Sequence, residues 1–60
     1  MKQYLITKNV YGNLYYYKEG DYWQGLITNA TYYPFAEATR ILVELSRKKP
    51  LDIFDIKEVD

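Results

Sequence analysis

Runs of apolar, strand-forming residues separated by polar turn residues predict three strands in the first half of the chain. The strands are expected at residues 2–8, 14–18 and 22–27, which are rich in the β-branched and aromatic residues that favour strands. Between them, Gly12-Asn13 and Glu19-Gly20-Asp21 supply residues that tolerate turn conformations. Because short turns join neighbouring antiparallel strands, we expect a three-stranded meander.

The spacing of apolar residues changes after Pro34 and predicts a helix over residues 34–48. Proline is favoured in the first turn of a helix because its missing N–H would have no partner there. Pro50 ends the helix, since the residue before a proline avoids the α-helical region. The positions spaced by three and four residues form one apolar stripe: Phe35, Ala38, Ile41, Leu42 and Leu45.

Residues 51–59 predict a last strand with an irregular pattern. Its apolar residues fall on one face of the strand up to Ile53 and on the other face from Phe54. Either both faces are buried there, or a bulge moves the following residues to the opposite face. We favour a bulge or twist near Asp55, because one helix cannot cover both faces of a sheet. A helix of about 15 residues spans roughly 22 Å, which is enough to bring this strand beside the first one.

These elements predict a two-layer α+β fold of order β-β-β-α-β, with one helix packed on one face of an antiparallel sheet. Residues 1–60 are too few for more than a single domain. The other sheet face has no helix to cover it. We expect Leu14, Tyr16, Trp23 and Ile27 to lie under the helix, and Tyr15, Tyr17 and Tyr22 to stand on the open face.

The composition narrows the chemistry. The chain has eight Tyr, one Trp and two Phe in 60 residues, but no Cys and no His. It therefore lacks disulfides, the usual zinc ligands and the commonest general base. We predict a protein that is not an enzyme and that uses no cofactor and no metal site.

The exposed tyrosines and a basic group at the helix end are the candidate binding residues. Tyr is enriched at protein interfaces because it offers a large contact area at a low cost in side-chain entropy. The predicted partner-binding residues are Tyr11, Tyr15, Tyr17, Tyr22, Arg47, Lys48 and Lys49. Three alternatives stay open: tyrosines that only stabilise the sheet, a face that stacks bases of single-stranded nucleic acid, and a face that forms a homodimer.

Charge and hydropathy narrow the partners further. The formal net charge is +0, which argues against nucleic acid as the partner, because such proteins are usually basic. No segment approaches the length of about 20 apolar residues that a membrane span needs, and the apolar run near Met1 is too short for a signal peptide. We expect a soluble cytoplasmic protein that does not contact membranes.

From Tyr22 onward, one series of positions forms a recognisable pattern: Trp23, Ala30, Tyr32, Glu37-Ala38, Ile41-Leu42 and Ile56-Lys57-Glu58-Val59. The pattern resembles small proteins of phages and mobile elements, and several anti-CRISPR and other anti-defence proteins are similar in size and topology. The resemblance implies a phage-encoded inhibitor that binds a host protein, such as a CRISPR effector, in the host cytoplasm. It implies no site residues. The tyrosine density and the start of the helix at Pro34 depart from the pattern.

Overall fold

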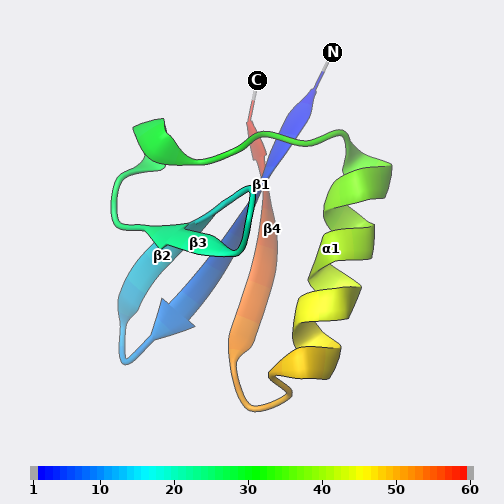
Figure 1. Ribbon diagram of the computed structural model, residues 1–60. Coiled ribbons are helices and arrows are strands. Elements are labelled where there is room, and N and C mark those ends of the chain that lie inside the picture. The colour runs from blue at the N-terminus through cyan, green and yellow to red at the C-terminus, as the bar shows by residue number, and fades with distance from the viewer. Residues whose placement is uncertain (1, 60) are drawn as a thin grey trace.

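Four antiparallel strands and one helix make up the fold of the computed structural model, which describes residues 2–59 (Figure 1). The predicted α+β architecture is confirmed. Within residues 2–59, no helix is both long and apolar enough to cross a membrane. The elements are β1 (Gln3–Val10), β2 (Asn13–Lys18), β3 (Tyr22–Gln24), the 3₁₀ turn η1 (Ile27–Asn29), α1 (Phe35–Lys48) and β4 (Ile53–Val59).

The strand order is β3-β2-β1-β4, so the last strand lies beside the first, which the length of the helix allows. The predicted bulge near Asp55 is wrong. β4 pairs with β1 without interruption, from Gln3 opposite Val59 to Asn9 opposite Ile53. The change of face is nevertheless real, because Phe54 packs against the core on the helix side while Ile53 is exposed on the other side.

The main core cluster lies between the sheet and α1. Its buried residues come from both layers, and Trp23, Ile41, Phe54 and Ile56 pack around them. Ala38 has no exposed surface, and its small side chain allows the helix to approach the sheet closely. The buried members of this cluster are Ile6, Tyr17, Tyr33, Ala38 and Leu45. Leu5 is also fully buried, but it points to the opposite face of the sheet from Ile6.

The two faces of β2 are the reverse of those predicted. Tyr17 is only 8% exposed and pairs with Trp23 across β2 and β3, so both rings lie on the helix side. Tyr15 shares that side and is half-buried, whereas Leu14 and Tyr16 point to the opposite face. The expectation that Tyr15 and Tyr17 stand on the open face is therefore wrong, as is the placement of Leu14 and Tyr16 under the helix.

The loop between β2 and β3 explains this reversal. Its closing pair is Lys18 and Tyr22, so three residues form the loop and Tyr22 shares a face with Lys18. Gly20 and Asp21 in this loop both have positive φ angles, of 95° and 65°. Tyr22 therefore stands on the open face, as predicted, while Tyr17 cannot.

The third strand is shorter than predicted and ends at Gln24. Ile27 belongs to η1 and is exposed, so its expected position under the helix is wrong. Gly25 follows directly after the strand, and glycine weakens strand pairing because it has no side chain to pack.

The segment between η1 and α1 lies between β1 and β2 at the end of the sheet where these two strands separate. Tyr33 and Tyr4 exchange two backbone hydrogen bonds of 2.8 and 2.9 Å, and the Thr31 N–H donates to the Tyr17 carbonyl at 3.0 Å. The segment therefore bonds to both β1 and β2 where these strands separate. Its position buries the Tyr33 ring beside that of Tyr17, with 6.2 Å between ring centroids. Figure 1 shows this segment crossing above the sheet toward α1.

Candidate functional site

The β1–β2 turn presents a fully exposed aromatic ring. Val10 pairs with Asn13, so Tyr11 and Gly12 form a two-residue turn, with φ angles of 50° and 84°. Two positive φ angles are the signature of the type I′ turn that suits the twist of a hairpin. The Asn9 side chain accepts a hydrogen bond of 3.0 Å from the Gly12 N–H. The Tyr11 side chain is 100% exposed and has no packing partner in this turn.

The α1–β4 connection lies at the same end of the molecule. The Asp52 N–H donates to the Lys49 carbonyl at 3.1 Å, which closes a turn with Pro50 and Leu51 at its centre. Leu51 is 96% exposed, and Ile53 is also largely exposed. This turn and the hairpin line one shallow hollow of about 410 Å³. We define the apolar tip as Tyr11, Leu14, Leu51 and Ile53; Leu14 and Ile53 flank Asn9 on neighbouring strands.

The conformation of Tyr11 is unfavourable for its residue type. A residue with a Cβ loses about 1–2 kcal/mol in the left-handed region, which is why Gly, Asn and Asp dominate such turns. Asn at this position would adopt the same turn with less strain. The fold itself gains no burial from the ring, because the side chain is fully exposed. Neither the exposed ring of Tyr11 nor its strained backbone stabilises the fold, but an exposed aromatic ring is what a binding surface uses.

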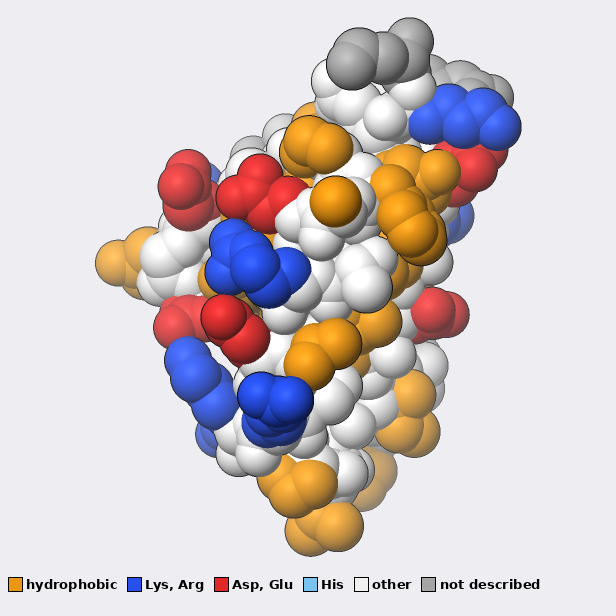
Figure 2. Space-filling view, turned by 90° about the vertical axis from the view of Figure 1, so that its right-hand side faces the viewer, with side chains coloured by type: hydrophobic (Ala, Val, Ile, Leu, Met, Phe, Trp, Pro, Cys, Tyr) orange, Lys and Arg blue, Asp and Glu red, His pale blue; other side chains and the backbone are white. Residues whose placement is uncertain are grey.

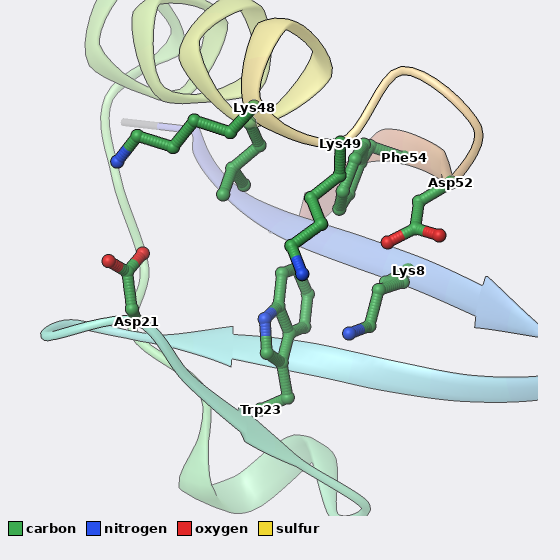
Figure 3. A pocket seen from close by; sticks show the side chains of 8 residues that line it. Lys8, Asp21, Trp23, Lys48, Lys49, Asp52 and Phe54 are labelled. Atoms are coloured by element: carbon green, nitrogen blue, oxygen red, sulfur yellow. The ribbon is translucent and has the colours of Figure 1, made fainter.

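A second hollow, of about 320 Å³, lies between the end of α1 and the sheet (Figure 3). We call it the basic pocket. Lys8 comes from β1, Lys48 from the last turn of α1, and Lys49 from its C-cap. Figure 3 shows the Lys8 and Lys49 ammonium groups beside Trp23, whereas the Lys48 side chain extends toward the Asp21 side of the hollow. The complete lining is Lys8, Asp21, Trp23, Leu45, Lys48, Lys49, Asp52 and Phe54.

The three lysines of the basic pocket have no close acidic partner. Within residues 2–59, the ion pairs shorter than 4.0 Å involve only Lys2 and Arg40 as cations. The Lys8 ammonium instead lies 4.5 Å from the centre of the Trp23 ring, as a cation–π contact. The pocket therefore has an excess of one formal positive charge, from three lysines against the two aspartates of its lining, with no ion pair to these lysines within 4.0 Å among residues 2–59.

The buried tyrosines serve the fold. The Tyr17 hydroxyl donates to Asp21 at 3.2 Å. Burial raises the pKa of Tyr17 above its ordinary value, and the negative charge of Asp21 adds to this effect. Burial also raises the pKa of Tyr33, with a contribution from Glu19. Both phenols therefore stay protonated and neutral at physiological pH.

The predicted site residues fall into three groups. Tyr11 lies at the apolar tip, and Lys48 and Lys49 line the basic pocket beside it, with Arg47 exposed in the same helical turn. Tyr22 is exposed on the open face and belongs to neither feature. Tyr17 is buried and Tyr15 is half-buried on the helix side of the sheet, so neither residue offers an exposed ring to a partner.

The sequence alone did not identify five of the residues that form the apolar tip and the basic pocket: Lys8, Leu14, Trp23, Leu51 and Ile53. Leu51 carried a usable signal, because a leucine directly after Lys49-Pro50 falls in a turn, where a large apolar side chain has little to pack against. Lys8 carried no such signal, since its closeness to Trp23 depends on the pairing of three strands.

No protein-family model, no curated protein and no solved structure matches the chain. Residues 2–59 hold no cluster of three or more His, Cys, Asp or Glu that could bind a metal ion. The function is therefore inferred from the geometry of the apolar tip and the basic pocket.

Proposed function

We propose that the protein is a non-catalytic protein-binding module that docks through its apolar tip. One observation carries this proposal: two large side chains, Tyr11 and Leu51, are 100% and 96% exposed and line the same hollow. Small proteins often expose single apolar residues, but adjacent large ones that leave water on binding are typical of interface anchors. The strained backbone of Tyr11 supports the same conclusion.

The neighbouring charges indicate the chemistry of the partner. Lys49 lies two residues before Leu51 in the same connection, and Arg47 and Lys48 precede it. Figure 2 shows hydrophobic side chains at the lower end of the molecule, with Lys and Arg side chains directly above them. A complementary surface would present an apolar socket with an acidic rim, since opposite potentials favour association.

The same charges argue against pairing of two apolar tips. In a two-fold symmetric dimer the same patch meets itself, so cations beside the patch are brought close to their own copies. Arg47, Lys48 and Lys49 of both copies would then repel each other around the contact. A different protein therefore fits the apolar tip better than a second copy of this chain.

The resemblance to small phage proteins supports a more specific form of this proposal. In that form, the partner is a host defence protein, such as a CRISPR effector, and the protein acts as a phage-encoded inhibitor in the host cytoplasm. Inhibition by occlusion needs only an exposed anchor surface and no catalytic group, which suits the chemistry of the apolar tip.

Site-specific photo-crosslinking tests this proposal. A photoreactive phenylalanine analogue replaces Tyr11 in one variant and Tyr32 in a matched one, and the protein is produced in candidate host cells. We expect position 11 to crosslink to one protein in preference, which is then purified for affinity measurements. Leu51→Ser should weaken its binding at least tenfold, as expected for an interface anchor. Leu26→Ser, at another exposed leucine, should change affinity little.

Two results would contradict the proposal. One is a crosslink only to a second copy, together with a mass in solution that doubles as concentration rises, which would establish the homodimer. The other is a partner whose affinity is unchanged by Leu51→Ser. Inhibition of a purified CRISPR effector by the wild-type protein, lost in Leu51→Ser, would support the more specific form.

A further inference from the structure

We propose that the basic pocket binds a carboxylate group of the partner protein. This inference rests on the proposed function, because it assigns a ligand to the hollow beside the apolar tip. The carboxylate could belong to an acidic side group or to the C-terminus of the partner, and both present the same monoanion.

The cations of the basic pocket provide the attraction. Lysine side chains from β1, the end of α1 and its C-cap line one hollow of about 320 Å³, and the Lys8 and Lys49 ammonium groups lie together beside Trp23. None of Lys8, Lys48 and Lys49 forms one of the ion pairs found within residues 2–59. Like charges that share a hollow repel each other, and a bound anion relieves this repulsion. Charge-assisted hydrogen bonds from ammonium groups to a carboxylate are stronger than neutral ones.

The charge of the lining favours a monoanion over phosphate. Three lysines and two aspartates, Asp21 and Asp52, line the pocket, so a single formal positive charge remains in excess. The C-terminal end of α1 also carries the negative end of the helix dipole, which two of the lysines offset. A carboxylate matches this excess, whereas a phosphate group carries about −1.5 to −2 charges at pH 7.

The aromatic wall of the pocket argues against a nucleic-acid ligand. Base stacking needs an open ring face. The Trp23 ring is in contact with Lys8 over its face, with Phe54 at 5.9 Å and with Tyr17 at 5.3 Å. It therefore acts as a wall against which the CH₂ groups of an acidic residue or an apolar neighbour can pack.

Trp23 provides the readout, since it is the single tryptophan of the protein and lines the pocket. The probes are the peptides acetyl-Gly-Leu-Glu-Leu-Gly-amide, its Gln analogue, and acetyl-Gly-Leu-Leu with a free C-terminus. Titration at low salt should shift the Trp23 fluorescence and its indole N–H resonance with one or both of the carboxylate peptides. The Gln analogue should cause no saturable shift. The two carboxylate peptides distinguish a side-chain ligand from a C-terminal one.

Charge-neutralising variants locate the binding. Lys49→Gln and Lys48→Gln should each weaken the preferred peptide about three- to tenfold, a loss of the size expected for one charge-assisted contact. Lys57→Gln removes the same charge from an exposed lysine outside the pocket and should leave affinity within twofold. Unfolding curves of all variants check that the fold is retained.

Several outcomes would overturn the inference. They are equal binding of the Glu and Gln peptides, no saturable shift with any peptide, and equal weakening by Lys57→Gln and Lys49→Gln. Tighter binding of inorganic phosphate or of a single-stranded oligonucleotide would also overturn it. Failure of these titrations, combined with a Leu51-dependent partner, would reject only the carboxylate ligand and would leave docking by the apolar tip in place.

Discussion

At one end of β1, Tyr4 is bonded to Tyr33 by two backbone hydrogen bonds, while at the other end Tyr11 stands fully exposed. The first end is closed by the segment before α1, which lies between β1 and β2 where these strands separate. The second end has two turns and no covering segment within residues 2–59. Both ends are rich in aromatic or apolar side chains, so residue type alone does not separate a core from a binding surface.

The difference between the two ends lies in what each ring contributes to folding. Tyr33 is only 8% exposed and contacts other rings, so its burial stabilises the fold by the hydrophobic effect. Tyr11 is exposed and strained, so it contributes nothing comparable. Stability should therefore be sensitive to substitutions at the closed end, and binding to substitutions at the apolar tip.

The largest expected loss of stability comes from substitution of Tyr33 at the closed end, and the adjacent Tyr32 serves as its control. Tyr33→Ala should destabilise the protein by about 3–5 kcal/mol, since it removes a buried ring and leaves a cavity. A domain of this size has a stability of about 3–5 kcal/mol in total, so this variant should be largely unfolded at 25 °C. Tyr32→Ala should cost about 1 kcal/mol or less, because that ring is partly exposed. Urea unfolding followed by circular dichroism measures both, and equal losses would contradict the comparison.

A medium effect is expected from alkaline pH. Burial raises the pKa of Tyr17 above 10.0 in the folded state, so the unfolded polypeptide loses this proton first as pH rises. The folded state then binds more protons, and stability decreases as pH rises from about 10 through the folded-state pKa. Tyr17→Phe lacks this proton and should lose less stability between about pH 9 and about pH 11, on either side of the ordinary pKa of tyrosine. At pH 7 it should cost about 1 kcal/mol, for the hydrogen bond to Asp21.

Urea midpoints at several pH values test this expectation. Tyr22→Phe is the matched control, because it removes a phenol hydroxyl from an exposed ring. The control should retain the wild-type dependence on pH. If Tyr17→Phe shows the same dependence as the control, then Tyr17 does not contribute to the alkaline loss of stability.

The smallest effect on stability is expected at the apolar tip, where the substitution should stabilise the protein and not destabilise it. Tyr11→Asn should stabilise the protein by about 0.5–1 kcal/mol, because Asn-Gly is favoured in a type I′ turn. The same variant should bind the partner less tightly, since it removes the exposed ring. Thermal unfolding and affinity for the crosslinked partner measure the two quantities. A variant that is both less stable and equally active in binding would show that Tyr11 serves the fold.

The helix and the order of the elements along the chain were predictable because their signals are local. Pro34 and Pro50 bracket α1, and the apolar stripe between them defines its buried side. The length of the helix is enough to bring the last strand beside the first, but the sequence alone leaves the position of that strand open, and the structure places β4 beside β1. The helix and the order of the elements depend on residue type and spacing, which the sequence states directly.

The buried tyrosines were not predictable in the same way. Tyr15, Tyr16 and Tyr17 are consecutive and identical, so they give no alternation from which to choose a face. The choice is made by the three-residue loop that pairs Lys18 with Tyr22. The bonding of Tyr33 to Tyr4 joins positions far apart in the sequence, and no local pattern marks it.

The candidate site was predicted in part, for the same physical reason. Tyr11 and Lys48–Lys49 lie at turns and helix ends, where exposure can be inferred from local structure. The basic pocket depends on Lys8 and Trp23 from strands that are not adjacent in the sheet order. A site formed by residues of several elements can be predicted only after the pairing of those elements is known.

The pairing of Gln3 with Val59 has a practical consequence for engineering. These residues lie at one pole of the sheet, and Tyr11 follows the far end of β1, which at eight residues is about 26 Å long. A tether, a label or a second module attached beside either residue would therefore lie at the opposite end of the domain from the apolar tip, and the apolar tip would point away from the attachment. Several copies displayed in this way would gain avidity without any alteration of the contact itself.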